Sequence, residues 1–236
     1  MIRLDKYLAD MGVGTRQEVK KYIRQGRVSL DGEMIKKPEQ KVDENTQTVQ
    51  VDGTAVGYAT YEYYMLNKPA GVISATEDRK QTTVVDLIET KKRKDLFPVG
   101  RLDKDTVGLL LITNDGELAH RLLSPKKHVD KRYYARVDGI VTAEDQEAFA
   151  RGVNIGSEAE PEMTMPAELE ILTSDTISEI RLTIREGKFH QVKRMFEAVG
   201  KQVIFLKRET MGTLVLDETL APGAYRPLTD EELKNL

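Results

Sequence analysis

The sequence predicts an α+β protein in two parts. Residues 1–58 show two helical patterns followed by a hairpin signal, whereas strand-like runs dominate from Tyr63 onward. These runs do not alternate regularly with helices, as they would in a doubly wound parallel fold. We therefore expect a small helix-helix-hairpin domain, residues 1–58, and a larger domain, residues 59–236, with a mixed, mainly antiparallel sheet and flanking helices.

The first domain begins with an amphipathic helical pattern. Apolar residues recur at helical spacing from Leu4 to Met11, and Gly12 and Gly14 end the pattern. Asp5 lies off the apolar stripe, where an aspartate normally faces water. The pattern therefore predicts a helix with a solvent-exposed Asp5.

A second helix and a hairpin follow. Thr15 and Glu18 have the spacing of a capping box, and "VSLDGEMI" places two short alternating runs around Asp31-Gly32, a strong hairpin signal. "QTVQVDGTAV" is expected to add one more strand. Basic side chains at i, i+4, i+8 and i+11 form one stripe: Arg16, Lys20, Arg24 and Arg27. Charge alone fits a solvated helix face and a phosphate-binding face equally well.

The larger domain contains four runs with strand character. They are "YYMLNK", "LLLIT", "YYARVDG" and "ISEIRLTIR", separated by turn residues. Helical stretches are expected between and after them, near residues 84–90, 116–123, 142–150 and 190–199.

The composition narrows the classes of chemistry. The chain has 39% hydrophobic and 32% charged residues, and no apolar run approaches the ~18 residues of a membrane span. Its N-terminus lacks the apolar stretch of a signal peptide, so we expect a cytoplasmic protein. Without cysteines and with three scattered histidines, it offers no thiolate and no evident metal site. A net charge of −3 argues against coating nucleic acid by bulk charge but allows local basic faces.

The tetrapeptide "RLDK" occurs twice, and only the second copy stands in a context suited to chemistry. It follows Pro98 and Gly100 and precedes the apolar run "LLLIT", so Asp103 is expected on a loop at the mouth of a buried strand. The alternative is that Asp103 only hydrogen-bonds its own loop.

A second segment presents basic groups together. In "EGKFHQVKRMFEAVG" the core stripe of a helix leaves His190, Lys193 and Arg194 on the opposite face. This face could be solvated, or it could meet a phosphate or a carboxylate. A carboxylate beside Lys⁺ would stay ionised and could act as a nucleophile.

Residues 1–58 resemble the small RNA-binding domain first recognised in protein S-four of the small ribosomal subunit. The stretch "RLDKYLADMGVGTRQEVKKYIRQGRVSLDGEMI" carries this resemblance. In that family the second helix and the hairpin contact RNA. The resemblance therefore implies that the basic stripe binds RNA.

Nearly the whole chain resembles the RsuA-type pseudouridine synthases, which modify small-subunit ribosomal RNA. "NKPAG", "GRLDKDTVGLLLITNDGELAHRL" and "EGKFHQVKRMFEAVGKQV" carry the resemblance. It implies that Asp103 is the nucleophile, Tyr133 the active-site tyrosine and Lys193 the partner of the aspartate. Arg194 is the second choice for that partner, and strand alternation turns Tyr134 to the other face. Further basic residues are expected to support the loop or contact RNA: Lys68, Arg101, His190, Arg194 and Arg208.

The implied reaction moves the uracil base from N1 to C5 attachment, so we expect no redox cofactor, nucleotide or metal. The expected partner is ribosomal RNA, free or in an assembling small subunit, and the expected protein is a monomer without membrane association. Alternatives are a synthase for large-subunit ribosomal RNA, a non-catalytic ribosome-associated RNA-binding factor and, more remotely, a hydrolase with an aspartate nucleophile.

Overall fold

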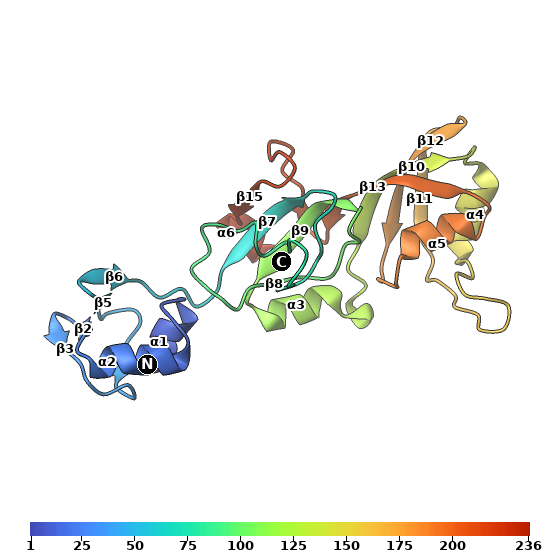
Figure 1. The fold of residues 1–236 in the computed structure, drawn as a ribbon. Coiled ribbons are helices and arrows are strands. Elements are labelled where there is room, and N and C mark those ends of the chain that lie inside the picture. Colours follow the sequence, from blue (N-terminus) through green and yellow to red (C-terminus); the bar gives the residue numbers. More distant parts are fainter. The chain divides into compact units, whose positions relative to one another are not determined.

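The computed structural model describes residues 1–236, apart from the side chain of Pro125. The chain divides into two compact units (Figure 1). The first unit comprises Met1–Glu62 and Glu89–Leu96, and the second comprises Tyr63–Ile88 and Phe97–Leu236. Both units combine helices with antiparallel strands, which confirms the α+β prediction.

Two helices and two small sheets build the first unit. The helices bury an apolar cluster that includes Leu4, Leu8, Val19 and Ile23. Thr15 and Glu18 form the predicted capping box at the start of the second helix. The helices are α1 (Leu4–Asp10) and α2 (Arg16–Arg24); one sheet pairs β1 (Ile2–Arg3) with β4 (Lys41–Val42), and the other has the order β3 (Glu33–Met34), β2 (Val28–Leu30), β5 (Val49–Val51), β6 (Thr54–Val56).

The first unit contains two Asp-Gly hairpins. Asp31 and Gly32 have φ of 51° and 87°, and this left-handed pair joins β2 to β3 as predicted. Asp52 and Gly53, with φ of 49° and 80°, join β5 to β6 in the same way. The expectation of a single strand in "QTVQVDGTAV" was therefore wrong, because its own Asp-Gly pair folds the stretch into two strands.

Asp5 does not face water, contrary to the prediction. Its side chain is 0% exposed, and Arg3 donates two hydrogen bonds of 3.0 Å to its carboxylate. Arg16 and Lys20 of α2 lie 3.6 and 3.8 Å from it. Burial raises the pKa of Asp5, but the hydrogen bonds and the positive charges of Arg3 and Arg16 outweigh burial and leave the pKa below its ordinary value.

The segment Glu89–Leu96 belongs to the first unit, although it follows the first strand of the second. Glu62 accepts hydrogen bonds from the backbone N–H groups of Lys92 and Arg93. The buried guanidinium of Arg93 donates to Tyr58 Oη and pairs with Asp95. These contacts fix a basic segment on the first unit.

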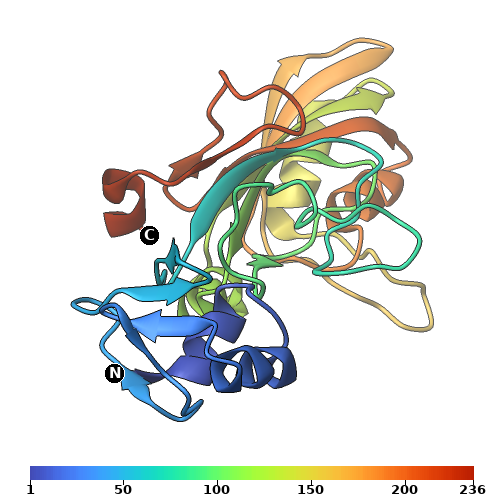
Figure 2. The same cartoon turned by 60° about the vertical axis from the view of Figure 1, so that its left-hand side comes forward.

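A nine-stranded mixed sheet forms the framework of the second unit within the described residues. Only β9 and β13 pair in parallel, and the other pairs are antiparallel. Strands far apart in sequence, β7 and β9 with β10 and β13, lie side by side (Figure 2). The strand order is β11 (Glu168–Thr173), β12 (Ile177–Ile184), β10 (Lys131–Asp138), β13 (Gln202–Met211), β9 (Val107–Thr113), β7 (Tyr63–Lys68), β15 (Tyr225–Pro227), with β14 (Leu214–Val215) on β13 and β8 (Phe97–Pro98) on β9.

Helices cover this sheet in two places. Leu118 and Leu122 of α3 join the apolar cluster formed by β7 and β9. α4 and α5 meet through Phe149 and Phe196, whose ring centroids are 5.0 Å apart, and lie beside the β10–β13 part of the sheet (Figure 1). None of the helices in the described residues is long and apolar enough to span a membrane. The helices of the second unit are α3 (Gly116–Leu123), the 3-10 turn η1 (Pro125–Lys127), α4 (Ala143–Arg151), α5 (Gln191–Glu197) and α6 (Asp230–Lys234).

Residues 84–90 do not form the predicted helix. The N–H groups of Asp86 and Ile88 donate to the carbonyls of Thr83 and Val85, three residues earlier, as in isolated turns. The Asp86 carboxylate accepts from both the N–H and the hydroxyl of Thr83, which closes the turn on itself. A β-branched pair at the start of the stretch further lowers its helix propensity.

Candidate active site

Hydrogen bonds from Ser74 and Gly71, in the segment after β7, hold the backbone of the loop that carries Asp103. The Ser74 hydroxyl donates to Leu102 O at 2.8 Å and accepts from Leu102 N at 3.1 Å. Gly71 N donates to Lys104 O at 2.8 Å. Both neighbours of Asp103 are therefore held while its own side chain remains partly exposed.

Lys68, from the "NKPAG" segment, also stabilises this loop by hydrogen bonds to its backbone. Its side chain is 0% exposed, and burial lowers its pKa to about 8. An ammonium in this position cannot reach an RNA phosphate, so of the two predicted roles only loop support agrees with its surroundings. Its Nζ donates to three backbone oxygens: those of Pro69, Lys104 and Thr106.

Arg208 is also an internal residue. Its side chain is 2% exposed, and its Nε donates to Leu109 O of the neighbouring strand at 2.8 Å. It lies opposite Tyr133 on β10 and Gly108 on β9. Of the two roles predicted for Arg208, only support from within the fold agrees with these surroundings, because its guanidinium lies inside the sheet layer.

Lys193 of α5 lies against the Asp103 carboxylate. Its Nζ is 3.1 Å from Asp103 Oδ2, and His190 Nε2 is 3.5 Å from Asp103 Oδ1. Arg194 points elsewhere, since its guanidinium contacts Glu162 and the Ile155 carbonyl. Of the two candidate partners for Asp103, the geometry thus brings only Lys193 to it.

Asp105 is a site residue that the sequence reasoning missed. Lys193 Nζ donates to its carboxylate at 2.7 Å, so one ammonium bridges two aspartates. This hydrogen bond holds the pKa of Asp105 below its ordinary value. Burial lowers the pKa of Lys193, but its hydrogen bonds to the two carboxylates outweigh burial and leave the pKa raised. The spacing of two aspartates in "RLDKD" was the available signal.

Tyr133 and Asp103 line one open cleft. Arg101, His190, Lys193 and Leu206 also line this cleft. Tyr133 is 7% exposed and lies on the same face of β10 as the buried Ala135. Tyr134, on the opposite face, contacts Phe205 instead, as strand alternation predicts.

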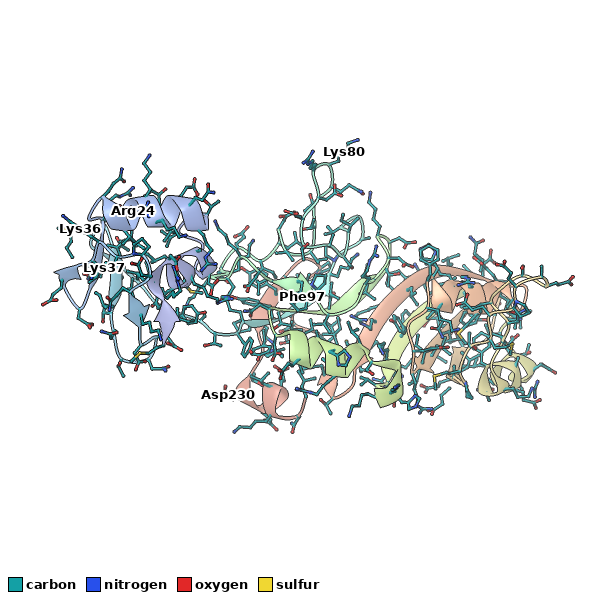
Figure 3. The ribbon with its side chains drawn as sticks, turned by 90° about the horizontal axis from the view of Figure 1, so that it is seen from below. Arg24, Lys36, Lys37, Lys80, Phe97 and Asp230 are labelled. Carbon is teal, nitrogen blue, oxygen red and sulfur yellow. The ribbon has the colours of Figure 1, made fainter. Side chains whose placement is uncertain are left out.

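The four basic side chains of the stripe on α2 differ in whether a carboxylate lies near them. Arg16 and Lys20 lie near Asp5, and Arg27 pairs with Asp52. The side chain of Arg24, on the exposed side of α2 (Figure 3), makes no ion pair or hydrogen bond within the described part of the chain. Three of the four cations therefore have an intramolecular carboxylate nearby, and Arg24 does not.

The geometry of the cleft suits chemistry on a planar uncharged ring. It combines a carboxylate held beside an ammonium, an aromatic ring and an apolar Leu206 side chain on fixed elements. A carboxylate in this setting can act as a nucleophile or as a base. The ring and the apolar side chain can stack against a flat base that has been turned out of its helix.

Comparisons with known proteins agree with this chemistry. Residues 62–198 match the RNA pseudouridylate synthase family, and residues 2–47 match the S4 domain. A Bacillus subtilis protein named as the uncharacterized RNA pseudouridine synthase YtzG is 52% identical over 98% of this chain and 97% of its own length. The ribosomal small subunit pseudouridine synthase A of Vibrio parahaemolyticus is 44% identical over 100% of this chain and 99% of its own length.

A solved structure has the same fold. A crystal structure of a pseudouridylate synthase superimposes with a TM-score of 0.68 at 37% identity, covering 100% of this chain and 99% of that one. The family match spans more than half of the chain, and the relatives cover nearly all of it. The chain therefore belongs to the RNA pseudouridylate synthase family, and it is an RNA pseudouridine synthase, an isomerase.

Proposed function

We propose that this enzyme converts a specific uridine of small-subunit ribosomal RNA to pseudouridine, with Asp103 as the nucleophile. The observation that carries the proposal is the cleft in which the Asp103 carboxylate lies 3.1 Å from Lys193 Nζ and beside Tyr133. The relatives named ribosomal small subunit pseudouridine synthase A support the choice of RNA.

The reaction breaks the N1–C1′ bond of uridine and joins C5 to C1′, after which the C5 proton leaves to solvent. Asp103 attacks the sugar or the base, or promotes elimination, while Lys193 stabilises the carboxylate in its ionised form. Tyr133 stacks on the flipped uracil as it turns. N1 takes up a proton from solvent in place of the one that leaves C5, so the RNA gains and loses no other atom.

The two parts of the chain divide the work in this proposal. Residues 1–58 capture RNA through the stripe on α2, and residues 59–236 contain the catalytic cleft. Arg101 lines the cleft, is exposed and has no described intramolecular partner, which suits a phosphate contact near the target uridine. We expect the enzyme to act in the cytoplasm as a monomer.

The test is a comparison of two RNAs. Purified protein is incubated with transcripts of small-subunit and large-subunit ribosomal RNA, and pseudouridine is located by carbodiimide labelling and primer extension. One modified position in the small-subunit transcript is the expected result. Modification of the large-subunit transcript alone would move the target to that RNA, and no pseudouridine in either RNA or in partly assembled subunits would contradict the proposal.

A further inference from the structure

Phe189 exposes its ring to solvent beside the catalytic cleft. The side chain is 75% exposed, more than any other Phe or Tyr side chain that the structure describes. Its backbone is fixed, because the Phe189 carbonyl accepts a hydrogen bond of 3.0 Å from Arg194 Nη1. Single exposed apolar side chains are common on protein surfaces, so the case depends on what surrounds this one.

The Phe189 ring stacks on the ring of His190. The centroids are 3.8 Å apart and the planes differ by 19°. On its other side His190 reaches the site, with Nε2 3.5 Å from Asp103 Oδ1. One face of Phe189 is thus covered by a residue of the cleft, and the remaining exposed surface is available to a second flat ring.

A strained turn at His190, stabilised by hydrogen bonds, produces this arrangement. His190 has φ of 48°, in the left-handed region that residues other than glycine rarely adopt. The buried Gln191 holds the turn: its Oε1 accepts from Lys188 N at 2.9 Å, and its Nε2 donates to Glu186 Oε1 at 2.9 Å. These hydrogen bonds fix the turn that carries the Phe189–His190 stack.

We propose that Phe189 is a stacking platform for an unpaired RNA base next to the target uridine. When the uridine turns into the cleft, a neighbouring base loses its stacking partner and exposes an apolar face. An aromatic side chain can replace that partner, and such stacking contributes about 1–3 kcal/mol per base without selecting its identity. This inference depends on the proposed function, since only an RNA with a flipped uridine places a base there.

The experiment uses the full-length protein and an RNA fragment that spans the uridine modified by the wild type. Phe189→Ala should lower kcat/KM by roughly 5- to 150-fold through KM, with little change in the saturated rate, and Phe189→Tyr should restore it. In a second RNA pair, the nucleotide on the 5′ or the 3′ side of the uridine is made abasic. With one of these abasic RNAs, the kcat/KM of the wild type should fall as far as Phe189→Ala lowers it on the intact RNA. The kcat/KM of the variant should fall no further on that abasic RNA.

Two results would overturn the inference. One is equal kcat/KM for Phe189→Ala and wild type on the intact RNA. The other is an effect of Phe189→Ala that is as large on both abasic RNAs as on the intact RNA, which would show that the ring acts only by supporting the loop. In either case wild-type pseudouridine formation on the intact RNA would leave the proposed function standing.

Discussion

Asp5 and Asp103 occupy the same position in two identical tetrapeptides, and their neighbours give them different properties. Asp5 is buried within the first unit, where Arg3 donates a hydrogen bond to each of its carboxylate oxygens. Asp103 stands in an open cleft, where a single ammonium faces one of its oxygens. Asp5 is fully buried, whereas the side chain of Asp103 is 25% exposed and, among the described residues, has only His190, at 3.5 Å, beside its other oxygen.

Lys193 determines the charge of the cleft in this account. Lys193→Met removes the ammonium that bridges Asp103 and Asp105, and its hydrogen bond holds the pKa of Asp105 below the ordinary value. The acid limb of the pH-rate profile should then move to higher pH. Lys193→Arg should keep the limb in place. Arg194→Met is the discriminating control, since an acid limb that moved in that variant alone would assign the role to Arg194.

Lys68 gives a pH dependence of stability. Its pKa falls from 10.5 to about 8 on folding, so the unfolded chain binds the extra proton between these pH values. More protons on the unfolded chain mean that the free energy of unfolding rises with pH across this window. The difference in that free energy between wild type and Lys68→Met should therefore increase from pH 8 to 10.5 in urea titrations. A difference that does not change with pH for Lys68→Met would refute the buried-ammonium description.

At the scale of elements, the helices and strands that could be predicted from the sequence are those that their own residues specify. The runs "YYMLNK" and "ISEIRLTIR" and the capping box at Thr15 specify their elements through neighbouring residues alone, and all three formed as expected. β13 was missed although it lies in the middle of the sheet, because its ten residues mix apolar and charged side chains. That strand is stabilised by pairing with β9 and β10, which a local pattern does not contain.

For the candidate site, too, the sequence did not contain the contacts between residues that lie far apart in the chain. The motif stretches placed Asp103, Tyr133 and Lys193 on separate elements, and folding brought them to one cleft. Burial could not be read from the sequence: Lys68 and Arg208 looked like surface charges but face backbone carbonyls inside the fold. Their surroundings come from strands distant in sequence.

The parallel pairing of β9 with β13 depends on Gly108. Its φ is 99°, and a Cβ at this position would lie 2.3 Å from the Arg208 carbonyl oxygen. Gly108→Ala should therefore force the two strands apart and lower the free energy of unfolding by more than about 2 kcal/mol. Gly116→Ala is the matched control, since a Cβ there meets nothing within 4 Å. Equal stability of the two variants in urea titrations would contradict the close approach.

At the scale of the whole molecule, the proposed function assigns RNA capture and catalysis to different units. Arg16→Ala/Arg24→Ala removes two exposed cations of α2 and should reduce the slope of log affinity against log salt by roughly 1.4–1.8, at 0.7–0.9 per phosphate. The saturated rate should stay the same. Lys234→Ala/Lys126→Ala removes two charges from the second unit and serves as the control. An unchanged slope in the α2 variant would mean that the stripe is only a solvated face.

Substitution is a cleaner test of this division than deletion. Removing residues 1–58 would also remove Asp10 and Tyr58, two partners of Arg93 in the segment Glu89–Leu96. The shortened protein would then leave the buried Arg93 without two of its partners. Effects on the catalytic unit could not be separated from loss of RNA capture.

Tritium release from ribosomal RNA labelled at C5 of uridine tests whether Asp103 is the nucleophile. Asp103→Asn keeps the shape of the side chain but removes the carboxylate, so it should release no tritium while binding RNA as tightly as the wild type. Asp105→Asn, two residues away and bound to the same Lys193, should still release tritium, as should Asp5→Asn at saturating RNA. Tritium release by Asp103→Asn at the wild-type rate would contradict the account.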